Sequence, residues 1–291
     1  MSRKTRVAKI AIGTNALLAA VKFSVGLMAK SSALVADAAD SSSDLVGDIF
    51  LLLGLSRAEA PPDDNHPYGH GKAECLASLA LGVLILAAAV TLLVRAISSV
   101  GAAKHPVPGS LALAAAGFSI IVNLALGLYM HRSSKIEHSP GLEAGGTHAL
   151  SDSATSVAAL IGIYLARRGY PLADPIVAGI VSLLVGRVAV GIILDAGNKL
   201  MDRAAPEEIV RAVRETATGF PGIWEVHSIR SRCSGSNYLL DLHIQVGPSI
   251  SVLDGHELGH RLEEEILSEV PGVLEVIVHV EPYLPENGEE T

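Results

Sequence analysis

The chain has few cysteines and few charges for its length of 291 residues. Cys75 and Cys233 are its only cysteines, which excludes a disulfide framework and a zinc ribbon built from cysteine. Charged residues make up 18% of the chain, below the roughly one quarter that is usual for soluble proteins. Acidic residues outnumber basic ones by 30 to 22, which argues against a nucleic-acid-binding protein, since such proteins need a basic surface. The phosphate-binding motif GxxxxGKS/T is also missing, so ATP is not expected as an energy source.

Apolar residues are abundant, at 49%, and the charges are unevenly placed. Residues 1–199 carry 16 Lys/Arg and 13 Asp/Glu, whereas residues 200–291 carry 6 and 17. We therefore expect a membrane domain over 1–199 and a soluble, acidic domain over 200–291. A bilayer core about 30 Å thick is spanned by about 20 helical residues. Six stretches of suitable length predict six transmembrane helices, near 8–29, 33–55, 75–100, 109–131, 141–166 and 173–196.

The distribution of basic residues predicts the orientation in the membrane. Six spans place both chain ends on one side, and the excess of Lys and Arg there favours the cytoplasm. We therefore expect a multi-pass protein of the cell (inner) membrane with both termini cytoplasmic. The basic start runs directly into a long apolar stretch with no small-residue cleavage site, so a retained first helix is expected and not a signal peptide. The basic residues on the predicted cytoplasmic side are Arg3, Lys4, Arg6, Arg57, Lys72, Arg132, Lys135, Lys199 and Arg203, against Lys30, Lys104, Arg167 and Arg168.

The acidic tail shows alternating helix and strand patterns. Residues 206–219 begin with Pro and acidic residues and end with Gly, which predicts an amphipathic helix. Residues 227–233 and 238–246 alternate in polarity as strands do, and 251–269 and 273–283 predict a second helix and a last strand. The order helix, strand, strand, helix, strand is that of a small α+β domain.

Four aspartates recur within the second apolar stretch at spacings of three and four residues: Asp37, Asp40, Asp44 and Asp48. This spacing puts the four carboxylates along one face of a helix. A single charge at the centre of a bilayer costs about 3 kcal/mol on insertion scales, so a row of carboxylates needs partners or a bound cation. We expect Asp40 and Asp44 to bind a metal, and Asp37 and Asp48 to support the ligands or to lie at a helix end.

The fifth apolar stretch carries His148 and Asp152 one helical turn apart, again on one face. Packed together, the two helices would supply three carboxylate oxygens and one imidazole nitrogen, a tetrahedral set that suits a zinc-sized divalent ion. One such aspartate alone could equally be an interior polar group bonded to a neighbouring helix, but two pairs in separate helices favour a metal site. The predicted transport site therefore consists of Asp40, Asp44, His148 and Asp152.

These motifs resemble those of the cation diffusion facilitators, the cation efflux family of divalent metal transporters. The DxxxD of Asp40 and Asp44 and the HxxxD of His148 and Asp152 occur here with six spans, an acidic tail and the loop DDNHPYGHGKAE at 63–74. The resemblance implies efflux of a divalent metal from the cytoplasm in exchange for protons, by a homodimer in a lipid bilayer. It also implies that the tail is a cytoplasmic αββαβ domain with a metallochaperone-like fold.

The loop between the second and third spans is a second candidate metal site. Asp63, His66 and His70 are spaced to fold around one ion, and they resemble the loop site of the family. A solvated, histidine-rich turn is the alternative interpretation.

The tail holds a third candidate site, which resembles the binuclear site of the family at the contact between two tails. Its residues lie in or beside the strands and the second helix: His227, His243, His256, His279 and Glu281. Some members of the family carry Asp where this chain has Glu281. His260, one turn after His256, is interpreted as a surface histidine.

Metal and protons compete at the predicted transport site, because a metal binds only deprotonated ligands. Imidazole titrates near neutral pH, which makes His148 the expected proton-coupled ligand. The chain is thus predicted to be a metal/proton antiporter and not an enzyme. One histidine among carboxylates favours zinc first and iron(II) second, and cadmium and cobalt also fit. Zinc is expected both as substrate and as a regulator bound to the tail.

Two other functions remain open at this point. An intramembrane metallohydrolase would use the same ion to activate water, but HExxH is absent and protein ligands fill all four expected positions. A membrane metal sensor would use the tail histidines, although a pure sensor needs no intramembrane site.

Overall fold

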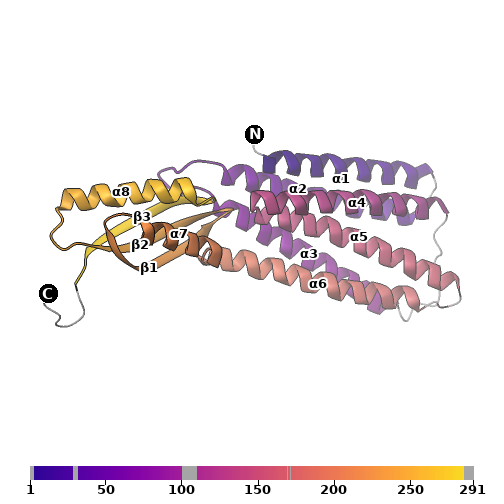
Figure 1. Ribbon diagram of the computed structural model, residues 1–291. Coiled ribbons are helices and arrows are strands. Elements are labelled where there is room, and N and C mark those ends of the chain that lie inside the picture. The colour runs from indigo at the N-terminus through magenta and orange to yellow at the C-terminus, as the bar shows by residue number, and fades with distance from the viewer. Residues whose placement is uncertain (1–2, 29–31, 100–109, 169, 171, 285–291) are drawn as a thin grey trace. The chain divides into compact units, whose positions relative to one another are not determined.

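A computed structural model describes residues 3–28, 32–99, 110–168, 170 and 172–284, with the side chains of some helical residues, Asp37 and Asp40 among them, left out. The chain divides into two compact units, Met1–Gly197 and Asn198–Thr291. The first is helical and the second contains a sheet (Figure 1).

The first unit is a bundle of six long helices, each of 26 to 28 residues. Their bounds extend past most of the predicted apolar stretches, because the helices continue into polar residues at their ends: α1 (Arg3–Met28), α2 (Ser32–Ala58), α3 (Lys72–Ser99), α4 (Ser110–Glu137), α5 (Pro140–Arg167) and α6 (Ala173–Leu200).

Small residues let these helices approach closely, as is usual for helices that pack without a hydrophobic drive between them. A Cβ atom on Gly146 of α5 would lie 3.0 Å from the backbone nitrogen of His131 in α4. A Cβ on Gly54 of α2 would collide with Ala77 of α3. Glycine at both positions is therefore required by the backbone contact between the helices.

Two apolar clusters fill the interior of the bundle. The first joins α1, α2, α4 and α5 near the end where α1 begins, and it includes Val7, Leu51, Leu55, Met130 and Leu142. The second joins α3, α5 and α6 through Leu81, Ile85, Ala89, Ala144, Val185 and Ala189. Polar residues of α2 and α5 lie beside these clusters and form the site described below.

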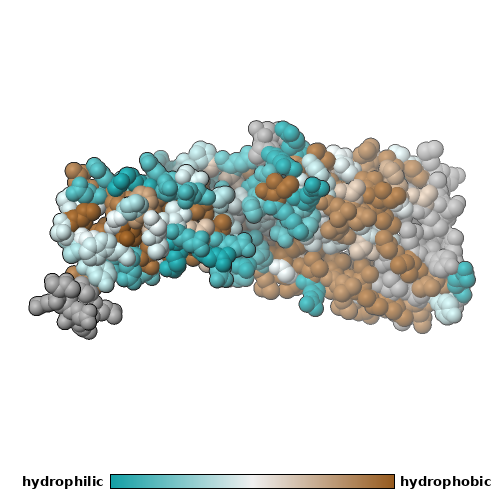
Figure 2. Space-filling model, viewed as in Figure 1, coloured by the Kyte–Doolittle hydropathy of each residue, from teal (hydrophilic) through white to brown (hydrophobic). Residues whose placement is uncertain are grey.

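The outer surface of the bundle is apolar on the face shown in Figure 2. By length and composition alone, three of the described helices contain stretches able to cross a membrane, namely Arg3–Val25, Lys72–Ser98 and Gly179–Leu200. The α2 helix carries four aspartates and the α5 helix carries one, Asp152.

The second unit has the predicted order helix, strand, strand, helix, strand. Its elements are α7 (Glu207–Gly219), β1 (Ile223–Ser234), β2 (Asn237–Val246), α8 (Val252–Glu269) and β3 (Val273–Pro282). The sheet order is β1-β2-β3, with β1 antiparallel and β3 parallel to β2. Each helix is followed by a Pro-Gly pair before the next strand, and Gly222 and Gly272 have the positive φ that this turn requires.

One face of this sheet is covered and the other carries the histidines. Buried side chains of α7, α8 and the strands form a single core that includes Val213, Leu242, Ile244 and Leu262. Side chains alternate across a strand, so His243, which lies between Leu242 and Ile244, points to the opposite face.

The β1 strand begins four residues earlier than the predicted strand. Register shifts between Ile223 and Glu225 and between Val226 and Ser228 interrupt its pairing with β2. A bulge breaks the period of two, so alternation could not show this part of the strand.

Candidate metal transport site

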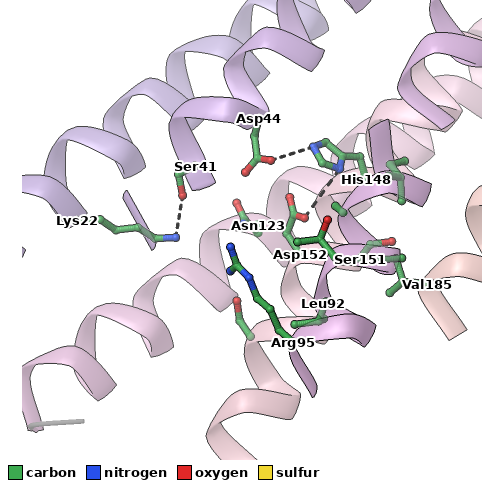
Figure 3. Close-up of a pocket in the computed structure, with 15 residues that line it drawn as sticks. Lys22, Ser41, Asp44, Leu92, Arg95, Asn123, His148, Ser151, Asp152 and Val185 are labelled. Atoms are coloured by element: carbon green, nitrogen blue, oxygen red, sulfur yellow. Dashed lines mark hydrogen bonds and ion pairs between the residues drawn. The ribbon is translucent and has the colours of Figure 1, made fainter. Parts of the chain in front are cut away.

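The structure brings together three of the four predicted transport ligands. The Nε2 atom of His148 lies 3.4 Å from Asp44 Oδ1, and its Nδ1 atom lies 3.8 Å from Asp152 Oδ1 (Figure 3). One ligand atom from each of the three residues lies within 4.8 Å of those of the others. A divalent ion can therefore be reached by all three side chains after small rotations, because ligand bonds to zinc are about 2.0–2.2 Å long.

Of the remaining aspartates of α2, the structure describes only the side chain of Asp48. The side chains of Asp37 and Asp40 lie outside the described residues, so the place of Asp40 in the ligand set remains a prediction. Asp48 is buried, and its Oδ2 atom accepts a hydrogen bond of 2.7 Å from Asn15 Nδ2 of α1. This bond holds Asp48 against α1, one helical turn from Asp44.

The three ligands line a cavity of about 380 Å³ that also contains two cationic side chains, Lys22 of α1 and Arg95 of α3. Figure 3 shows the ammonium group of Lys22 and the guanidinium group of Arg95 pointing into the same space as Asp152. Sequence reasoning did not identify either residue as part of the site. The signal was present, because an ionisable residue within a membrane span marks a functional position by default.

A buried carboxylate lies near the end of the bundle where α1 begins. Glu74 of α3 accepts hydrogen bonds from the Ser139 hydroxyl and from the backbone of Gly141, and it lies 3.6 Å from Lys4 Nζ. It is 1% exposed. Glu74 thus ties the starts of α1, α3 and α5 together, and sequence reasoning did not single it out.

The loop residues Asp63, His66 and His70 also form a cluster. Asp63 Oδ1 lies 3.2 Å from His66 Nδ1, and Asp63 Oδ2 lies 3.4 Å from His70 Nε2. The backbone amide of His66 donates a hydrogen bond of 2.7 Å to Asp63, which is the main reason that the pKa of this carboxyl is lowered. Asp63 therefore stays ionised at neutral pH and can act as a ligand.

Arg57, in the last turn of α2, occupies part of this loop cluster. Its Nη2 atom donates to His70 Nε2 over 2.7 Å, and the backbone oxygen of Pro61 is 3.2 Å from His70 Nδ1. Because Arg only donates and a carbonyl only accepts, these partners place the proton of His70 on Nδ1. An ion that binds His70 at Nε2 has to displace Arg57.

In the tail, four of the five predicted residues meet on the open face of the sheet. Glu281 lies at the centre, with one carboxylate oxygen 3.0 Å from His243 Nδ1 and 3.2 Å from His279 Nε2. Its other oxygen lies 3.4 Å from His227 Nε2. All three strands contribute, since His243 of β2 pairs in register with His279 of β3 and His227 belongs to β1. The hydrogen bond from His243 is the main cause that lowers the pKa of Glu281.

His256 lies elsewhere, on α8. Its ring packs edge-on against that of His260, with centroids 4.4 Å apart, and His260 is 2.9 Å from Glu263. His256 nevertheless lines a cavity of about 340 Å³ to which Glu281 also contributes. Its assignment to the tail site remains a prediction.

Comparisons with known proteins cover nearly the whole chain. Residues 8–201 match the cation efflux transmembrane domain, and residues 205–283 match the cytoplasmic domain of cation efflux proteins. The manganese efflux system protein MneP of Bacillus subtilis is 31% identical over 98% of both chains. This chain belongs to the cation efflux family, the cation diffusion facilitators.

Other members of the cation efflux family align over similar lengths. Metal tolerance protein 2 of Oryza sativa subsp. japonica is 30% identical over 97% of this chain and 79% of its own length. The magnetosome protein MamB of Magnetospirillum gryphiswaldense is 28% identical over 89% of this chain and 87% of its own. As a cation diffusion facilitator, the protein is a six-helix membrane transporter of divalent metal with a C-terminal α+β domain, and not an enzyme.

Proposed function

We propose that this protein exports a divalent transition metal from the cytoplasm in exchange for protons, and that zinc is its first substrate. The observation that carries the proposal is the cluster of Asp44, His148 and Asp152 beside a cavity within the helical bundle. Both ring nitrogens of His148 face carboxylate oxygens, so the groups that would hold the metal are also groups that take up protons. Loading the metal expels protons, and protonation expels the metal.

The donor set supports zinc as the first substrate. A histidine nitrogen among carboxylate oxygens, completed by the predicted ligand Asp40, makes a four-membered mixed set of the kind zinc accepts. Iron(II), cobalt and cadmium follow zinc, because imidazole suits these ions as well.

Manganese is the second candidate substrate, favoured by a different observation. A relative that aligns over 98% of both chains is named as a manganese efflux protein. Manganese prefers oxygen ligands in larger numbers, so His148 argues against it. Direct competition between the two ions decides between them.

The proposed orientation places both termini and the tail in the cytoplasm of the cell (inner) membrane. Nine basic residues flank the side where the chain begins and ends, against four on the other side. The tail is proposed to join two copies into a homodimer, since residues 205–283 match the cytoplasmic domain of the family.

Flux measurements test the proposed function directly. Purified protein in sealed vesicles should accumulate zinc faster when the vesicle interior is more acidic than the outside, so that protons leave as zinc enters. Zinc uptake should slow when this gradient is collapsed. Empty vesicles serve as the control, and manganese at equal concentration ranks the two substrates. A metal sensor would give no flux, and a channel would give flux that does not depend on protons beyond their effect on the membrane potential, so either result would contradict the proposal.

The tail cluster is proposed to respond to the same metal. Residues 200–291 carry 17 Asp/Glu against 6 Lys/Arg, so two tails repel each other at low ionic strength. Metal bound at His227, His243, His279 and Glu281, with His256 as the predicted fifth ligand, would reduce this repulsion and join the tails.

We expect the fragment 204–291 to become more compact and more strongly dimeric when zinc is added near neutral pH. The effect should fade towards about pH 5, because protonated imidazoles cannot bind metal. Glu281 keeps its charge over this range, since the pKa of its carboxyl is lowered, so the histidines cause the loss. Scattering and sedimentation measure both quantities.

Two variants control this experiment on the tail. Replacing His243 with Ala should abolish the response to zinc, whereas His260→Ala should preserve it, because His260 lies on α8 and bonds to Glu263. A fragment whose size and mass stay constant with saturating zinc near neutral pH would show that the tail histidines are not a metal-controlled switch.

A further inference from the structure

Lys22 is a buried, positively charged residue within an apolar helix. It is the only charged residue of α1 after Lys9, and it is 5% exposed. Its Nζ atom donates a hydrogen bond of 2.8 Å to Ser41 Oγ of α2. Lysine within a membrane span is costly, so such residues usually lie near negative groups and mark functional positions.

The negative groups near Lys22 are those of the transport site. Ser41 lies one turn before Asp44 on the same helix, so the hydrogen bond places the ammonium group beside the turn that bears a ligand. Lys22, Asp44 and Asp152 line one cavity, and Figure 3 shows the Lys22 side chain extending across from α1 into it. A fixed positive charge that lines the same cavity as the ligands repels any second cation that binds there.

The cavity extends from the ligands towards one end of the bundle only. Its lining comes from the second half of α1 and α3, at Lys22 and Arg95, and from the first half of α2, at Ser41. These residues approach the end of the bundle opposite Leu200, where α6 ends. Towards the other end, the apolar cluster fills the space among α1, α2, α4 and α5, Glu74 is buried, and a separate cavity of about 240 Å³ lies between α3, α5 and α6. Both cations thus lie on the side of the ligands that faces away from the end of α6.

We propose that Lys22 is an affinity-determining residue of the transport site. Its charge weakens metal binding from the side that faces away from the end of α6, which in the proposed orientation is the side where the exported metal leaves. Arg95 adds to the effect further along the cavity. This inference rests on the proposed function, because it assumes that the metal binds at Asp44, His148 and Asp152. A transported ion has to bind tightly enough to enter and weakly enough to leave. A fixed cation beside the site speeds release without changing the ligands.

The test compares Lys22→Gln with Lys22→Arg. Glutamine keeps a donor for Ser41 and removes the charge, whereas arginine keeps the charge. Both variants are made in purified protein whose loop and tail clusters are disabled by replacing His66, His70, His243 and Glu281 with Ala. Zinc binding is measured in this protein and again after adding Asp152→Ala. The difference between the two measurements is the binding that depends on Asp152. We expect Lys22→Gln to tighten this binding about tenfold and Lys22→Arg to change it by less than about threefold.

A second variant and a second readout extend the test. Arg95 is exposed, so Arg95→Gln leaves the packing intact and should tighten binding about threefold. In vesicles, Lys22→Gln should lower both the KM for zinc and the maximal rate, because release becomes slow. A role confined to packing or to the bond with Ser41 would not produce this combined change.

The outcomes separate this inference from the proposed function. Unchanged zinc affinity in Lys22→Gln, or equal changes in the Gln and Arg variants, would overturn the role of the charge. If Lys22→Gln does not fold, Arg95→Gln decides in the same way, and unchanged affinity there overturns the proposal. Tighter binding in a protein that shows no flux would support the role of Lys22 and would refute transport.

Discussion

Replacing Asp44 or Asp152 with Ala is expected to reduce zinc flux by at least about a hundredfold while expression and dimerisation stay intact. Loss of a residue that merely supports a metal ligand already costs about 10- to 100-fold in affinity. Each of these aspartates supplies one of the ligand atoms that lie within 4.8 Å of one another, and each faces a different nitrogen of His148. Removing either leaves the site incomplete and shifts its charge. Flux into vesicles at matched protein content measures the effect.

Asp48→Asn is the matched control for this experiment. Asp48 lies one turn from Asp44 on the same helix, but its carboxylate bonds to Asn15 and is not part of the ligand cluster. Asparagine keeps the size and a hydrogen-bonding side chain and leaves the ligand cluster in place, so a reduction of at most about tenfold is expected, the lower end of the range for a supporting residue. Flux near that of the unmodified protein in Asp44→Ala or Asp152→Ala would refute the proposed transport site.

The helices and the ligand pairs could be predicted because each follows from a period. A spacing of four residues places His148 and Asp152 on one face of α5 whatever surrounds it. The structure adds that α2 and α5 lie side by side, which brings Asp44 to 3.4 Å from His148. That contact depends on packing between distant segments, so the sequence predicts the ligand set only if these two helices pack together.

The features that sequence reasoning missed depend on the environment of single residues. The sequence places Lys22 within an apolar stretch and Glu74 beside the loop, but their roles appear only when their partners Ser41, Ser139 and Lys4 are in place. The sequence predicts Arg57 as a basic residue on the cytoplasmic side, and the structure adds its bond to a loop histidine. The periodicity of helices and strands cannot predict such contacts, because each contact joins elements that are distant in the chain.

The tail shows the same division. Alternation identified β2, because Leu242 and Ile244 face the core and His243 faces the other side. The meeting of His227, His243 and His279 around Glu281 required the strand order and register, with β2 in the centre of the sheet. His256 belongs to a helix and not to the sheet, so the register of the strands does not determine whether it lies near Glu281.

Replacing His148 with Asp is expected to change which ion the protein transports. His148 contributes the only nitrogen ligand predicted for the transport site, and its ring lies between Asp44 and Asp152. Aspartate makes the site all-oxygen, which favours harder ions such as manganese over zinc. The ratio of manganese to zinc flux should rise about tenfold, which corresponds to a change of roughly 1.4 kcal/mol in relative preference. Competition between the two ions in the same vesicles measures this ratio.

The matched control for the selectivity experiment is His70→Asp, the same substitution in the loop cluster. His70 lies beside Asp63 and Arg57 outside the bundle, so the ions that cross the membrane need not contact it. Its replacement should leave the ratio of manganese to zinc flux within about twofold, since the donor set of the transport site is unchanged. If His70→Asp shifts the ratio and His148→Asp does not, ion selection takes place at the loop before the metal reaches the bundle. If neither variant shifts it, selectivity is set by the packing of α2 against α5 and not by the imidazole.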